Sequence, residues 1–156
     1  MKRIIVLGIV FCLGFSALVS GDDKEYVEKA VGIFSSYAEL QKEATELLVR
    51  YVESLDKQTV FKEDFSREAE DLRSQSEELY KASDLDMPES PELLEFDRLF
   101  QEFAAVADNY FLLLMQLTDS EGEEEIADKL NSVTEILNSL KDKALKLKAE
   151  IDRLNG

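Results

Sequence analysis

Apolar residues recur at alternating steps of four and three along the C-terminal part of the chain. They are Ile126, Leu130, Val133, Leu137, Leu140, Ala144, Leu147, Ile151 and Leu154. This spacing places the side chains on one face of a helix, and its persistence over four heptads is typical of helices that pack lengthwise on other helices. The pattern predicts a long helix over about 123–154 and restricts the chain to an architecture of helix on helix.

Three earlier segments show the same periodicity. We expect helices over about 23–55, 60–82 and 90–118, with breaks at 56–59, 83–89 and 119–122. Short connections are typical of helices that are antiparallel neighbours. The sequence therefore predicts an all-α fold, an antiparallel up-down-up-down four-helix bundle with long amphipathic helices, as a single domain over 22–156.

Local signals predict how some of these helices begin or bend. Ser90, followed by Pro91 and Glu92, predicts a helix start with a hydroxyl cap. Ser120 and Glu123 have the spacing of a capping box for the last helix. Gly32, inside the first helix, costs about 1 kcal/mol relative to Ala and indicates either a close helix contact or a slight bend.

The third expected helix is apolar around most of its circumference. The run from Tyr110 to Met115 contains no polar residue, so Leu112 is expected to approach solvent in an isolated bundle. A second subunit, a protein partner or an apolar ligand would cover this patch. The alternatives are burial beneath the 83–89 loop or a single tolerated exposed leucine. The candidate contacts for a ligand or partner are Phe103, Tyr110, Phe111, Leu112 and Met115.

Residues 1–21 have the layout of a secretory signal peptide. Lys2 and Arg3 precede an apolar run from Ile4 to Leu18, and small residues lead to a cleavage site after Ser20 or Gly21. We expect an exported protein, periplasmic or extracellular, with no membrane insertion after cleavage. An N-terminal membrane anchor is the alternative, because the apolar run approaches the ~20 residues that span a bilayer.

The chain contains no histidine, and its single cysteine is Cys12, within the expected signal peptide. Histidine-ligated haem, di-iron Glu-x-x-His sites, zinc sites and histidine-activated nucleophiles are therefore not expected. Acidic residues crowd 119–125, but the EF-hand register is absent, so a solvated turn is the simpler interpretation. We expect no cofactor and no enzymatic activity, with carboxylate acid–base chemistry or cation binding as a third hypothesis.

The formal net charge is -16, with 34 acidic and 18 basic residues. Residues 22–90 carry nineteen acidic and nine basic side chains, whereas 123–156 carry eight and six. This charge disfavours nucleic acid and anionic membranes and leaves basic proteins or peptides as partners, or else serves solubility alone. We predict a non-catalytic interaction or adaptor protein, with self-association included. The alternative is a carrier of an apolar small molecule within the bundle.

Overall fold

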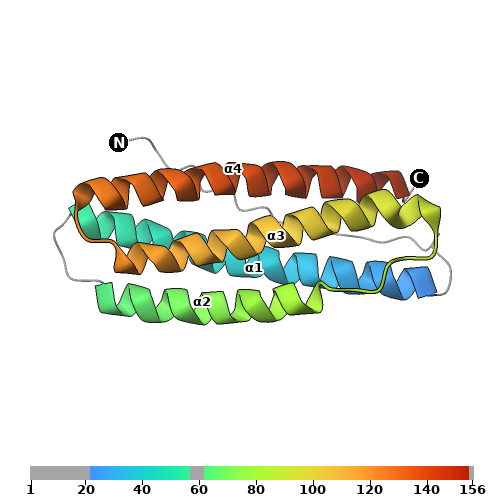
Figure 1. The fold of residues 1–156 in the computed structure, drawn as a ribbon, viewed down its shortest axis with the longest axis horizontal. Coiled ribbons are helices and arrows are strands. Elements are labelled where there is room, and N and C mark those ends of the chain that lie inside the picture. Colours follow the sequence, from blue (N-terminus) through green and yellow to red (C-terminus); the bar gives the residue numbers. More distant parts are fainter. Residues whose placement is uncertain (1–21, 57–61, 155–156) are drawn as a thin grey trace.

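The computed structural model describes residues 22–56 and 62–154, and this part of the chain contains helices and connections but no strand. The elements are α1 (Asp22–Asp56), α2 (Lys62–Ala82), the 3₁₀ turn η1 (Pro91–Leu93), α3 (Leu94–Gln116), the 3₁₀ turn η2 (Leu117–Asp119) and α4 (Glu123–Leu154). The four α-helices lie side by side along a common direction (Figure 1). The prediction of an all-α chain with four long helices is confirmed, and the helix ends agree with the sequence within a few residues.

The segment 1–21, on which the prediction of a signal peptide falls, lies outside the described residues, as do residues 57–61 between α1 and α2. Within the described ranges, no helix combines the length and the apolar character needed to cross a membrane.

The chain before α3 is fastened to α1 rather than capped by a hydroxyl. Ser90 makes no capping hydrogen bond through its side chain, and the helix begins with the 3₁₀ turn at Pro91, where the Leu93 N–H donates to the Ser90 carbonyl at 3.0 Å. The peptide N–H groups of Glu89 and Ser90 donate to the Asp23 carboxylate at 3.2 and 3.5 Å. The helix start at Ser90 is as predicted, but the hydroxyl cap is wrong, because the Leu93 N–H that the hydroxyl would bind donates to the Ser90 carbonyl instead.

The predicted capping box at the start of α4 is also wrong. The Ser120 hydroxyl donates backwards, to the Gln116 carbonyl at 3.3 Å, so it belongs to the end of the preceding turn. The Glu121 N–H donates instead to the Glu125 carboxylate at 3.1 Å. Gly122 lies between them with a φ of 100°, a conformation that side-chain-bearing residues rarely adopt.

Helix α3 packs against each of the other three α-helices. Its sequence explains this position, because a helix with apolar residues around most of its circumference must be covered on several sides. Its buried residues are Phe96, Leu99, Phe100, Phe103, Ala104, Ala107, Tyr110, Phe111 and Leu114.

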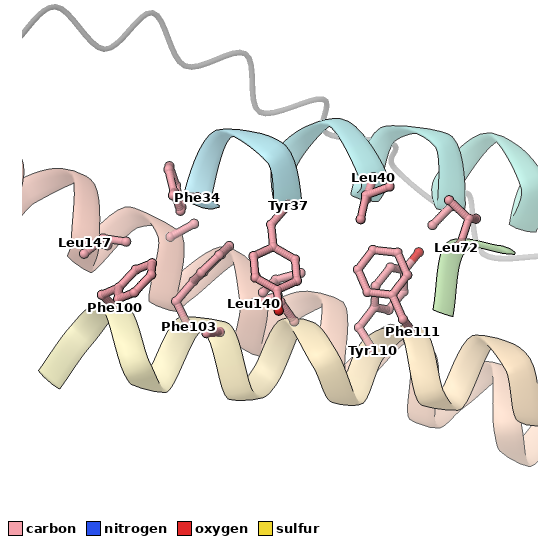
Figure 2. Close-up of a cluster of buried hydrophobic side chains, with 14 of the residues drawn as sticks. Phe34, Tyr37, Leu40, Leu72, Phe100, Phe103, Tyr110, Phe111, Leu140 and Leu147 are labelled. Carbon is pink, nitrogen blue, oxygen red and sulfur yellow. The ribbon is translucent and has the colours of Figure 1, made fainter. Parts of the chain in front are cut away.

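Aromatic side chains from α1 and α3 fill the centre of the bundle. The Phe103 ring meets the rings of Phe34 and Tyr37 edge to face, with centroid distances of 4.7 and 5.8 Å (Figure 2). Tyr37 stacks on Phe111 at 6.5 Å. Such pairs each add about 1 kcal/mol to the free energy gained from burying the rings. These contacts fix α1 on α3 in one register.

The seam of α4 is covered more completely in its second half. Leu140, Ala144, Leu147 and Ile151 are buried there, together with Val133 nearer the start. The remaining predicted seam residues are half-buried and pack against the edge of the core: Ile126, Leu130, Leu137 and Leu154.

Candidate functional site

The five residues predicted to contact a ligand or partner separate into two groups. Phe103, Tyr110 and Phe111 are 3%, 0% and 1% exposed and belong to the core (Figure 2). Leu112 and Met115 are half-buried. The structure thus brings three of the five together inside the bundle and leaves two at the surface of α3, and a binding role for them stays a prediction.

The loop at 83–89 does not cover the apolar run of α3, contrary to one of the alternatives drawn from the sequence. Its contacts lie at the other end of that helix, where the Gln101 amide donates to the Ser83 carbonyl at 2.8 Å and Asp23 holds the N–H groups of Glu89 and Ser90. Figure 1 shows the connection to α3 and the end of α3 at opposite ends of the bundle.

Tyr110 places a polar atom in this core. Its hydroxyl is buried and has no hydrogen-bond partner among the described residues. Burial raises its pKa, and the nearby Thr45 hydroxyl opposes the shift. The Thr45 hydroxyl donates its own proton to the Gln41 carbonyl at 2.7 Å. A buried unpaired hydroxyl costs stability.

Three described surface cavities lie on another part of the molecule, along α1, α2 and the 84–89 loop, and none is lined by the five predicted residues. We call this surface the acidic side. Its three described cavities are the central groove between the middle of α1 and α2, the end groove between the start of α1 and the 84–89 loop, and the apolar groove beside Gly32.

The central groove, of about 320 Å³, runs between the middle of α1 and α2. It is lined by Glu43, Glu46, Arg50, Glu68, Asp71, Leu72 and Gln75. The Arg50 guanidinium bridges the groove in a two-pronged ion pair with the Glu68 carboxylate, and this hydrogen bonding raises the pKa of Arg50. Within the described residues no ion pair engages Glu43, Glu46 or Asp71. The groove therefore presents more carboxylates than basic groups, four against the one guanidinium of Arg50.

The end groove, of about 430 Å³, lies between the start of α1 and the 84–89 loop. Five carboxylates line it, those of Asp23, Glu25, Asp84, Asp86 and Glu89. Its one basic side chain, Lys29, bonds Glu25 at 2.6 Å, which lowers the pKa of Glu25 and raises that of Lys29. The Met87 side chain, 72% exposed, also lines this groove.

Tyr26 lines the end groove and connects it to α3 through a hydrogen bond and a ring contact. Its hydroxyl donates to the Asp97 carboxylate at 2.6 Å, and its ring meets Phe96 edge to face at 6.2 Å. Burial, followed by the hydrogen bond to Asp97, raises the pKa of Tyr26. The wall of the groove is therefore held rigidly on the core.

The apolar groove, of about 330 Å³, continues from the end groove and shares Lys29 and Leu85 with it. Ile33 and Leu79 form its floor with Leu85, and all three pack against the core. Gly32 also lines it, and a Cβ built on Gly32 would meet nothing within 4 Å. The close helix contact considered for this glycine is therefore wrong, because the space beside it is open.

Within the described residues, no group of three or more His, Cys, Asp or Glu side chains is arranged to hold a metal ion. The acidic side offers negative charge at two grooves and an apolar surface at the third.

Sequence reasoning placed the excess of negative charge in residues 22–90, but it did not predict the three grooves or that their residues come together. Two signals in the sequence point to this surface: the density of acidic residues over 60–89, and a glycine in the first helix that no close contact requires.

The chain matches no protein-family model, no curated protein and no solved structure, so its function has to be inferred from the geometry of the acidic side.

Proposed function

We propose that this protein is a non-catalytic helical-bundle interaction protein that binds a basic partner protein through its acidic side. The observation that carries the proposal is the set of carboxylates along the grooves of α1 and α2. The end groove has five carboxylates against one ammonium group, and Glu25 already pairs with that group. A partner with Lys and Arg side chains would supply the missing positive charge.

Electrostatics favours this class of partner over the others considered. Complementary charge speeds the encounter of two proteins and fixes their orientation, while like charge opposes nucleic acid, anionic membranes and a second copy of the same acidic surface. Rigid helices suit a surface of this kind, since little conformational entropy is lost when it binds.

Helix α4 differs from α1 and α2 in the charge that it carries. Its second half carries four lysines, Lys141, Lys143, Lys146 and Lys148, and Lys143 pairs with Glu102 of α3. A basic partner would therefore be attracted to α1 and α2 more strongly than to α4.

A carrier of an apolar small molecule is the second candidate. The observation on its side is the Tyr110 hydroxyl, a buried polar atom with no partner among the described residues, which the polar end of a ligand could satisfy. The three described cavities lie elsewhere, so this candidate is weaker than the first.

We also propose that the four helices form an antiparallel up-down-up-down bundle. Support comes from cross-helix contacts whose residue numbers run in opposite senses. Between α1 and α2 they are Tyr37–Ser76 and Arg50–Glu68, between α2 and α3 Ser76–Asp108 and Ser83–Gln101, and between α3 and its turn and α4 Glu92–Arg153 and Glu102–Lys143. The opposite colour gradients of successive helices in Figure 1 agree with this arrangement.

Export is proposed on the sequence of residues 1–21 alone, and N-terminal sequencing of the protein from the cells that make it tests it. Removal of the signal peptide would leave an N-terminus at Gly21 or Asp22.

The test of the binding function is native mass spectrometry of the protein purified gently from its own cells or medium. The central-groove variant Glu43→Gln/Glu46→Gln/Asp71→Asn is compared with an α4 variant that loses the same number of exposed carboxylates, Glu124→Gln/Glu135→Gln/Asp142→Asn. We expect a basic protein bound to the wild type and to the α4 variant and much less of it on the central-groove variant.

A bare monomer in all three samples would contradict the proposal, as would equal loss of the partner from both variants. A mass gain of small-molecule size that disappears on denaturation would favour the carrier instead.

A further inference from the structure

The apolar groove and the end groove form one continuous recess with two different surfaces. They share Lys29 and Leu85, so the apolar floor passes directly into the acidic rim. The floor consists of Ile33, Leu79 and Leu85, all half-buried against the core. Part of their apolar surface remains at the groove, and burying it under a partner would be favourable at about 25 cal/mol per Å².

Gly32 keeps this recess open. It lies within an unbroken helix, where glycine is unfavourable by about 1 kcal/mol relative to alanine. Nothing lies within 4 Å of a Cβ built at this position, so no neighbouring atom requires the glycine. Because Gly32 lines the recess, a larger side chain at this position would occupy part of its open space.

The charged side chains around the recess, which we call its rim, determine the charge of a segment that could bind there. Asp84, Asp86 and Glu89 lie on the loop side, and Asp23 and Glu25 lie on the helix side. Lys29 is paired with Glu25, so the recess is left with an excess of negative charge. A second copy of this chain, with a net charge of -16, would be repelled from it.

We propose that this recess is a docking site for a short segment of a partner protein in which an apolar side chain is flanked by Lys or Arg. The apolar side chain enters beside Gly32, and the basic groups meet the carboxylates of the rim. A volume of about 330 Å³ lies at the low end of the range for binding pockets and suits the side chains of a peptide. This inference rests on the proposed binding of a basic protein and names the part of the partner that is recognised.

The test uses a short fluorescent peptide in which leucines alternate with pairs of lysines, and a matched peptide with serine in place of each leucine. Binding to the whole chain is followed by fluorescence anisotropy. We expect the leucine peptide to bind about tenfold more tightly than the serine peptide, since burial of one aliphatic side chain supports a change of that size.

Because a Cβ at Gly32 meets nothing within 4 Å, Gly32→Leu should fold normally, and by occupying part of the recess it should weaken the leucine peptide by about tenfold or more. Ser35→Leu is the matched control, because it adds the same side chain to an exposed position of α1 that does not line the recess. It should leave binding unchanged. The double variant Asp84→Asn/Asp86→Asn should weaken both peptides and reduce the effect of salt on binding.

Equal binding of the two peptides, or equal binding to the wild type and Gly32→Leu, would overturn the docking site. The same variants of the purified complex distinguish this failure from failure of the proposed function. If the native partner stays bound to Gly32→Leu, the docking site in the recess is wrong but the proposed binding of a basic protein stands. If neither the native partner nor the leucine peptide binds the wild type, both proposals are wrong. Circular dichroism and thermal melting confirm that each variant is folded.

Discussion

Arg73 of α2 and Asp108 of α3 form a largely buried ion pair across the interface of the two helices. Their side chains are 15% and 20% exposed. The guanidinium bonds the Asp108 carboxylate and also donates to the Asp108 carbonyl at 3.1 Å, and the Ser76 hydroxyl donates to the same carboxylate at 3.3 Å. The Tyr37 hydroxyl of α1 donates to the Ser76 carbonyl at 3.4 Å, so the cluster links three helices.

This cluster matters most for α2, which has few buried apolar residues. Only Phe65, Ala69 and Leu72 of its described apolar side chains are buried. A polar contact with a defined geometry therefore contributes much of what positions α2, which forms one wall of the central groove.

Removal of one partner from this ion pair should destabilise the protein strongly. Arg73→Leu leaves the Asp108 carboxylate without its ion-pair partner in a mostly buried position and should lower the free energy of unfolding by about 3 kcal/mol. Asp108→Leu should cost less, because Arg73 keeps its ion pair with Glu77 at 3.1 Å. The double variant should lose much less than the sum of the two. Arg67→Leu, which breaks an exposed pair with Asp64, is the control and should change little. Urea denaturation measures all four, and additive effects would mean that the pair does not act as a unit.

The two described glycines should respond in opposite directions to alanine. Gly32→Ala should raise the free energy of unfolding by about 1 kcal/mol, because the position is helical and a Cβ meets nothing within 4 Å. Gly122→Ala should lower it by about 1 kcal/mol, because its φ of 100° strains any residue with a side chain. Thermal melting under identical conditions compares the two. A destabilising Gly32→Ala would show that the space beside this glycine is occupied.

Tyr110→Phe should stabilise the protein. It removes a buried hydroxyl without a hydrogen-bond partner among the described residues and keeps the ring, for an expected gain of about 1 kcal/mol. Tyr26→Phe is the matched comparison and should be destabilising, since its hydroxyl bonds Asp97 at 2.6 Å. A loss of stability in Tyr110→Phe would indicate that a partner satisfies this hydroxyl, as the carrier hypothesis requires.

Stability should fall in alkaline solution above about pH 10. Burial raises the pKa of Tyr26, Tyr37, Tyr51 and Tyr110 in the folded state, while the unfolded chain releases these protons near the ordinary value of 10.0. The folded state thus holds more protons, and stability present below that pH is lost as the pH rises toward the folded pKa values. Tyrosinate absorbance and helical circular dichroism should change together. Ionisation of these tyrosines with full retention of helix would contradict this account.

The sequence predicted the helices well because each has a strong apolar period and few residues that break helices. Ile126 to Leu154 illustrates this, since a spacing without exceptions led to a single continuous helix. Local caps were predicted poorly. Ser90 and Ser120 both have the expected residue types nearby, but neither hydroxyl caps a helix, because the Leu93 N–H donates to the Ser90 carbonyl and the Ser120 hydroxyl donates to the Gln116 carbonyl. A contact between Asp23 and Ser90 joins residues that are far apart in the chain, and no local pattern reports it.

The candidate site was the hardest part to predict. An apolar run such as Tyr110 to Met115 indicates burial or binding equally, and three-dimensional packing on α1 decided that Tyr110 and Phe111 are core residues. The recess beside Gly32 depends on how α1, α2 and the 84–89 loop meet, which periodicity does not determine.

The most direct test of the central claim is lysine cross-linking of the protein to its bound partner, with the linked sites identified by mass spectrometry. Lysines report on both surfaces: Lys24, Lys29, Lys42 and Lys81 lie on α1 and α2, and Lys141, Lys146 and Lys148 lie on α4. If the acidic side binds the partner, the links will concentrate on the first group. Links that concentrate on α4 would contradict the proposed interface.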